Sequence, residues 1–187
     1  MELLDDHIRF LVREALKVHD AVPKLTILYL QGYHDTTTEP IVKILKDTKN
    51  LKVIAPKIDY DNGSVWNKLS ELIEKHKVTA IIGHSLGGYI GYYLSQKFYV
   101  PALLFSPAFE DKWYKLQPVP ENILYLPIKK YDKIVVMGAK DDELNIKNIE
   151  KLLIGKSMVY EEPEMNHQPN EEIFKKYLEL FVGKYLI

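Results

Sequence analysis

Short apolar runs alternate with amphipathic segments of helical period along most of the chain, and this alternation limits the fold more than any other feature of the sequence. Strands separated by segments long enough to form a helix pair in parallel, because each connection must cross from one end of the sheet to the other. We therefore expect an α/β fold, a three-layer α/β/α sandwich whose mostly parallel sheet has about six strands. The expected strands are 25–30, 51–56, 78–82, 101–105, 133–138 and 157–162.

Helix-start signals stand between these strands. Asn145 and Asn170 each precede a stretch of helical period, where the amide oxygen can accept a hydrogen bond from a first-turn N–H. Ser64 stands in the same position before a third helix, and threonines at 36–38 precede Pro40, a favoured first-turn residue. The expected helices are 36–48, a helix after Ser64, 86–98, 145–154 and a helix after Asn170.

The N-terminal segment, about residues 1–20, lies outside this alternation. Apolar residues recur there at spacings of three and four, which predicts an extra amphipathic helix. Such a helix could cover a sheet edge or pack against a second subunit, and the sequence assigns it no function. The chain has no internal repeat and no linker, so we expect a single domain over residues 1–187.

A second segment, 106–132, also breaks the alternation. It contains four prolines together with Phe109, Trp113 and Tyr114. We interpret it as a small cap insertion over the functional site. Its aromatic side chains either form a wall over that site or pack the insertion onto the core, and the sequence does not separate these alternatives.

The composition excludes several classes of function. The 187 residues include 25 basic and 26 acidic side chains, so no excess charge favours binding to nucleic acid or to an anionic membrane. The chain has no cysteine, which excludes disulfides, thiolate metal sites and a cysteine nucleophile. The N-terminus opens with acidic residues rather than the basic stretch of a signal peptide, and every apolar run is far shorter than the roughly 20 residues of a membrane span. We expect a cytoplasmic protein whose oligomeric state the sequence leaves open.

The sequence GHSLGG at 83–88 is the strongest functional signal in the chain. A G-x-S-x-G motif between a strand and a helix is typical of a nucleophile elbow, a reversal so sharp that the serine is strained and its hydroxyl exposed. Gly83 and Gly87 avoid Cβ collisions across that turn, and the helix N-terminus places partial positive charge beside Ser85. We expect the His84 side chain to point away from the hydroxyl and to have a structural role.

Two alternatives to the elbow remain. One is a glycine-rich turn that carries an inert serine. The other is a phosphate-binding loop, although the sequence lacks the lysine and the G-x-G-x-x-G spacing of such loops.

A nucleophilic serine needs a base and a carboxylate that orients the base. In a strand–elbow–helix protein of this kind the chain order is serine, acid, histidine. Of the six histidines, His167 alone lies after the later strands, in the loop that follows 157–162. The acid should follow the strand 133–138, where Asp141 is the favoured candidate and Asp142 could serve instead.

The site also needs backbone N–H groups aimed at a developing oxyanion. The N–H of Leu86, directly after the nucleophile, is one expected donor. The loop after the first strand supplies the other, because Gly32 lets the backbone turn there and presents the N–H of Tyr33. An ordinary strand-to-loop turn is the alternative for this loop. We expect the substrate to be bound by residues of this loop and of the cap insertion, namely Gln31, Gly32, His34 and Trp113.

These motifs together resemble the α/β-hydrolase superfamily and, more narrowly, the small bacterial YqiA-like serine esterases. The resemblance is carried by LYLQGY, GHSLGGYIGYYLSQKF, VPALLFSPAF, GAKDDE and MNHQ. It covers residues 25–110 well and the rest of the chain by landmarks only. It implies a minimal α/β-hydrolase fold and a serine-type esterase that acts on small or short-acyl esters without a metal or a cofactor.

The family pattern falls on particular residues of this chain. Ser85, Asp141 and His167 match its triad, and the oxyanion donors match Tyr33 and Leu86. Gln31 departs from the pattern, which usually has histidine before the glycine. That change leaves the backbone donor in place and alters the hydrogen bonding that fixes the loop.

The expected function is hydrolysis of a carboxylic ester through an acyl-enzyme intermediate, with a small-molecule ester as the binding partner. A thioesterase or amidase with the same triad is the alternative among enzymes. A binding protein without catalysis is the alternative from another class, and a serine, an aspartate and a histidine in the expected order argue against it. The sequence leaves the acyl group, the alcohol and the physiological substrate open.

Overall fold

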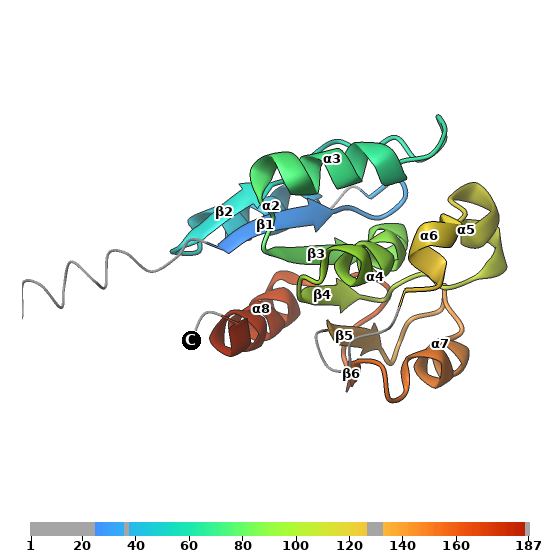
Figure 1. Ribbon diagram of the computed structural model, residues 1–187. Coiled ribbons are helices and arrows are strands. Elements are labelled where there is room, and N and C mark those ends of the chain that lie inside the picture. Colours follow the sequence, from blue (N-terminus) through green and yellow to red (C-terminus); the bar gives the residue numbers. More distant parts are fainter. Residues whose placement is uncertain (1–24, 36–37, 127–132, 186–187) are drawn as a thin grey trace, which may run out of the picture.

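The computed structural model describes residues 25–35, 38–126 and 133–185 (Figure 1). Within this part of the chain six strands form one sheet in the order β2-β1-β3-β4-β5-β6, and every neighbouring pair is parallel. The predicted α/β fold with a six-stranded parallel sheet is confirmed. The strands are β1 (Leu25–Leu30), β2 (Leu51–Ile54), β3 (Ala80–His84), β4 (Ala102–Phe105), β5 (Lys133–Gly138) and β6 (Met158–Glu162).

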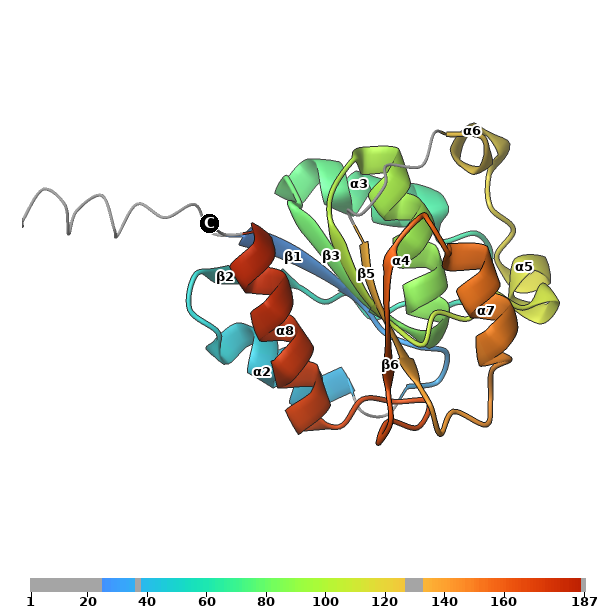
Figure 2. The same ribbon diagram turned by 90° about the horizontal axis from the view of Figure 1, so that it is seen from below.

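Helices cover both faces of this sheet, which gives the expected three layers (Figure 2). Alternate strand residues feed two separate cores, since Leu28 and Leu30 belong to one and Ile27 and Tyr29 to the other. One face is covered by α2 (Thr38–Asp47) and α8 (Glu171–Tyr185). The other face is covered by α3 (Trp66–His76), α4 (Ser85–Phe98) and α7 (Ile146–Leu153).

The direction of the strand order reverses at β1 and β3. The chain moves from β1 outward to β2, and then returns to the other side of β1 for β3 and the later strands. In open parallel sheets ligands bind where the strand order reverses, because the connecting loops diverge there. The loop after β1 and the start of α4, which contain the predicted site residues, both lie at this point.

Two of the predicted helix caps are confirmed. Asn145 Oδ1 accepts a hydrogen bond from the N–H of Asn148 at 3.2 Å, and Asn170 Oδ1 accepts one from Ile173 at 2.9 Å. The expected helix at about 1–20 and residues 36 and 37 of the expected threonine cap lie outside the described residues.

The predicted Ser64 cap is wrong. The helix begins one residue later than expected, and Val65 stands at its N-terminal boundary without a side-chain cap. The side chain of Gln117 instead accepts a hydrogen bond from the Val65 N–H at 3.2 Å. A side chain 52 positions away therefore binds the N–H of the residue at the start of this helix.

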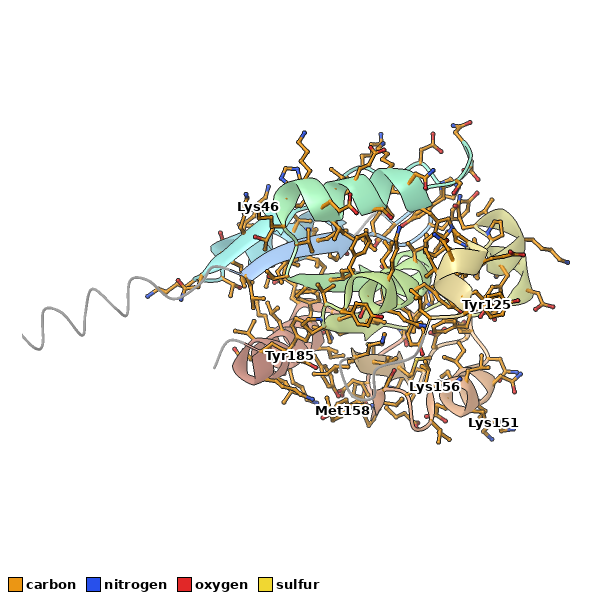
Figure 3. The ribbon with its side chains drawn as sticks, in the orientation of Figure 1. Lys46, Tyr125, Lys151, Lys156, Met158 and Tyr185 are labelled. Atoms are coloured by element: carbon orange, nitrogen blue, oxygen red, sulfur yellow. The ribbon has the colours of Figure 1, made fainter. Side chains whose placement is uncertain are left out.

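The segment after β4 forms two short helices, α5 (Asp111–Leu116) and α6 (Glu121–Leu124), and its residues 127–132 lie outside the described part. The Phe109 ring packs at 5.1 Å from Tyr92 of α4, and Tyr114 packs at 5.0 Å from Tyr89. These two aromatic residues thus pack the segment onto the core. At its far end Tyr125, after α6, is 80% exposed (Figure 3).

No helix among the described residues is long and apolar enough to cross a membrane.

The packing at Gly87 gives a prediction on stability. A Cβ atom at this position would collide with the carbonyl oxygens of Leu30 and Gln31, which are backbone atoms and cannot rotate away. We expect Gly87→Ala to lower the free energy of unfolding by about 1–3 kcal/mol or more, measured by urea denaturation. Gly183→Ala is the matched control, because the helical Gly183 has open space around it and alanine there should stabilise by up to about 1 kcal/mol. Equal stability of the two variants would contradict this packing.

Candidate active site

Ser85 occupies a sharp reversal between β3 and α4. The strand ends at His84 and the helix begins at Ser85 itself, whose φ of 52° lies in the left-handed region. A non-glycine residue in this region is strained, and such strain persists only where the surrounding structure enforces it. The local geometry is that of the predicted elbow.

His167 bridges the serine and an aspartate. Its Nε2 lies 2.8 Å from Ser85 Oγ, and its Nδ1 lies 2.9 Å from Asp141 Oδ2. A carboxylate only accepts hydrogen bonds, so Nδ1 carries the proton and Nε2 is left to accept the serine hydroxyl. All three side chains are buried, although Ser85 begins α4 and the other two lie in the loops after β5 and β6. The structure therefore brings together three residues that the sequence placed 26 and 56 positions apart.

The carboxylate of Asp141 is held from the side opposite to the histidine. Its Oδ1 accepts hydrogen bonds from the N–H groups of Glu143 at 2.9 Å and Leu144 at 3.1 Å. The neighbouring Asp142 is exposed, and Asp141 makes the contact with His167. Of the two acids that the sequence offered, the geometry favours Asp141.

Opposing effects act on the pKa values of this pair. For His167, burial lowers the pKa of the imidazole, but the hydrogen bond to Asp141 and the negative charges of Asp141, Glu143 and Glu110 raise it above 6.5. For Asp141, burial raises the pKa of the carboxyl, but the contact with His167 and the bond from the Glu143 N–H bring it below 3.8. The site therefore stabilises an imidazolium once His167 takes up a proton.

The loop after β1 lies directly against the nucleophile. A Cβ atom built on Gly32 would lie 3.2 Å from the Cβ of Ser85, so a larger residue here would require the loop or the serine to shift by a few tenths of an ångström. The tyrosines of this region fix the loop. Tyr60 donates its hydroxyl hydrogen to the Gln31 carbonyl oxygen at 2.6 Å, and Tyr33 donates to Asp61 at 2.8 Å.

The two expected oxyanion donors belong to the two segments next to the serine. Leu86 is in the first turn of α4, where backbone N–H groups have no partner within the helix. Tyr33 directly follows Gly32 in the loop that lies against Ser85. Both N–H groups thus belong to segments that border the hydroxyl.

The expected substrate-binding residues gather around Tyr33. The His34 ring lies 4.1 Å from the Tyr33 ring, and the Trp113 ring lies 5.3 Å from it on the other segment. For Gln31 the contact shown is made by its backbone, whose carbonyl oxygen accepts the Tyr60 hydroxyl hydrogen. Trp113 is thus the aromatic residue of the insertion that meets the loop after β1.

A polar hollow of about 370 Å³ opens beside the histidine. It is lined by Lys140, Asp142, Glu143, Asn166, His167 and Gln168. The Glu143 carboxylate lies 3.7 Å from His167 Nε2 and also lines this hollow.

A larger hollow of about 870 Å³ between α2 and α8 includes none of the predicted site residues. No group of three or more potential metal ligands occurs among the described residues.

Sequence motifs do not indicate the contacts of several residues of the site. Tyr60 and Asp61 carry no motif, and the sequence assigns no partner to Glu143, one of the three acids after β5, or to Asp35. Asp35 pairs with His84 at 3.3 Å, a contact across 49 positions. Each of these residues is recognised only through a long-range contact, for which a single sequence gives no signal.

Comparisons with known proteins agree with this fold. Residues 27–117 match the model of an uncharacterised protein family, UPF0227. This match includes the loop after β1 and the elbow and ends before Asp141 and His167. No curated protein matches the sequence.

Solved structures resemble the chain over most of its length. An α/β hydrolase enzyme from the metagenome of sediments of the Mar Chica lagoon, Morocco, is 15% identical over 86% of this chain and 90% of its own, with a TM-score of 0.63. The esterase domain of a Rhodothermus marinus protein is 13% identical over 90% of each chain, with a TM-score of 0.65. Zea mays acyl-protein thioesterase 2 is 13% identical over 86% of this chain and 93% of its own, with a TM-score of 0.58. At these identities the likeness establishes the fold.

Proposed function

From the α/β-hydrolase fold of the chain and its resemblance to the UPF0227 family over residues 27–117, we propose that this protein is a serine hydrolase that cleaves carboxylic esters. The observation that carries the proposal is the hydrogen-bonded series Ser85–His167–Asp141, which begins at a serine of left-handed φ. A serine that is strained, buried and bonded to a paired histidine has the arrangement of an activated nucleophile.

The proposed reaction proceeds in two halves. His167 Nε2 takes the proton of Ser85 Oγ as the oxygen attacks the ester carbonyl, and the oxyanion is bound by the N–H groups of Leu86 and Tyr33. The resulting imidazolium, stabilised by Asp141, gives its proton to the departing alcohol. Water then attacks the acyl-enzyme with His167 again as the base, and the acid leaves as Ser85 regains its hydrogen.

Short acyl groups fit the proposed site best. A long acyl chain needs a long apolar groove, since each buried methylene contributes about 0.8 kcal/mol only where such a groove exists. Phe109 and Tyr114 are committed to the core, which leaves Trp113 as the aromatic residue beside the loop after β1. The hollow beside His167 is polar and does not extend an apolar path.

The proposal is tested with a series of p-nitrophenyl esters from acetate to palmitate, assayed beside a thioester and an anilide. We expect kcat/KM to be highest for the short esters and to show no jump above the micelle threshold of the substrate, because the insertion packs on the core. A continued rise toward palmitate would contradict the small site. Preference for the thioester would instead favour a thioesterase, the activity named for the structural neighbour from Zea mays.

A further inference from the structure

His84 lies directly before the nucleophile and touches the two other loops of the site. It is 4% exposed. Its Nε2 lies 3.1 Å from the backbone carbonyl oxygen of His167, and its Nδ1 lies 3.3 Å from Asp35 Oδ2. One buried side chain thus joins the loop that carries the proposed base to the loop that follows β1.

The loop after β1 also packs on the His84 ring through its backbone. A Cβ atom on Gly32 would lie 3.1 Å from His84 Nδ1 and 3.2 Å from the Cβ of Ser85. The segment that presents the Tyr33 N–H therefore rests on the imidazole of His84 as well as on the serine. Any movement of this ring would shift a proposed oxyanion donor and the base together.

The hydrogen-bond partners of His84 favour a proton on each of its ring nitrogens. The His167 carbonyl oxygen only accepts, so Nε2 must carry a proton. A carboxylate also only accepts, so a neutral ring would aim the lone pair of Nδ1 at Asp35 at 3.3 Å, in a site where both side chains are at least 95% buried. A proton on both nitrogens satisfies both partners and forms a buried ion pair with Asp35.

We propose that His84, as an imidazolium paired with Asp35, is a positioning residue that holds the base loop and the oxyanion loop in register with Ser85. The proposal rests on the proposed function, because these loops matter together only if they serve one reaction. The serine hydroxyl is engaged by His167. The site thus contains two aspartate–histidine pairs, one that reacts and one that aligns.

Two substitutions of His84 distinguish its contact with the His167 carbonyl oxygen from its contact with Asp35. Asparagine places its amide nitrogen near the position of Nδ1 and loses the bond to the His167 carbonyl, whereas glutamine can place a donor near the position of Nε2 and keep it. We expect His84→Asn to lower kcat roughly 10²-fold with KM little changed, because a misplaced base slows the reaction without weakening ground-state binding. His84→Gln should retain clearly more kcat than His84→Asn.

The matched control is His76→Gln at the end of α3, which removes a histidine outside the site and should leave kcat unchanged. Thermal melting of each variant shows whether it remains folded at the assay temperature. Equal losses of kcat in His84→Asn and His84→Gln, or a loss confined to KM, would overturn the positioning role.

A spectroscopic measurement tests the protonation without any activity. In NMR spectra of protein labelled with ¹⁵N-histidine, we expect N–H signals from both ring nitrogens of His84, and Asp35→Asn should remove the Nδ1 signal. A single N–H signal from His84 in the wild type would overturn the proposed ion pair.

Labelling of Ser85 distinguishes failure of the serine-hydrolase proposal from failure of the positioning role of His84. If a fluorophosphonate probe does not label wild-type Ser85, the serine-hydrolase proposal fails, whatever the state of His84. If the probe labels Ser85 and the His84 variants behave like His76→Gln, the hydrolase proposal stands and the positioning role fails.

Discussion

Replacing Ser85 by alanine should remove nearly all ester hydrolysis, with an expected loss of roughly 10⁶-fold in kcat. The Oγ of Ser85 is the atom that His167 Nε2 contacts at 2.8 Å, and without it no acyl-enzyme can form. The fold should persist, because alanine occupies the same backbone position and leaves no larger side chain to accommodate. Turnover of p-nitrophenyl butyrate and the far-ultraviolet circular dichroism spectrum measure the two effects.

Ser64→Ala provides the control for this change. Ser64 is exposed and does not cap α3, so its loss should leave both turnover and stability unchanged. Mass spectrometry after treatment with a fluorophosphonate should find the label on Ser85 in the wild type and in Ser64→Ala. Labelling of the Ser85→Ala variant at a comparable rate would show that another residue is the nucleophile.

Asp141→Asn should lower kcat/KM by roughly 10⁴-fold, whereas Asp142→Asn should change it little. Asparagine keeps the shape of Asp141 but loses the charge that stabilises the imidazolium and the oxygen that fixes the His167 tautomer. Asp142 is exposed and is the matched control at the adjacent position. The reverse result would move the acid by one residue and leave the rest of the mechanism intact.

The same two variants also test how kcat/KM depends on pH. The proposed base acts only when neutral, so kcat/KM falls as the pH drops through the pKa of His167 in the free enzyme. The contact with Asp141 raises that pKa, so the acid limb of the wild type should have its midpoint above 6.5. In Asp141→Asn the midpoint should move to lower pH, and in Asp142→Asn it should stay in place. A midpoint that stays in place in Asp141→Asn, or one that moves equally in Asp142→Asn, would contradict the assigned pair.

Local patterns predicted most of the fold. The four inner strands β1, β3, β4 and β5 are largely apolar because they are buried on both faces. The caps at Asn145 and Asn170 use a donor only three residues away. The Ser64 cap failed for the opposite reason. The helix begins one residue later, at Trp66, and the N–H of the boundary residue Val65 donates to Gln117, a partner 52 positions away that no local pattern indicates.

The site likewise combines features that local sequence predicts with contacts between residues far apart in the chain. The elbow is a local motif, and the chain order of the fold selects Asp141 and His167 from few candidates, so their proximity could be predicted. The contacts of Tyr60 with Gln31 and of His84 with Asp35 join loops 29 and 49 residues apart. Only the packed structure determines which side chains meet at such distances. The aromatic residues of 106–132 were ambiguous for the same reason, because any of them could face either the core or the site.

Gln117 also has a consequence for the order in which the protein assembles. Its side chain bonds to the carbonyl oxygens of Tyr60 and Gly63 and to the N–H of Val65, across 57, 54 and 52 positions. Contacts of such long sequence separation form only after the intervening chain has been synthesised. During synthesis, the turn before α3 therefore lacks these hydrogen bonds until Gln117 has left the ribosome. In hydrogen-exchange experiments, protection of the Val65 amide reports the docking of the insertion rather than the formation of the helix that it precedes.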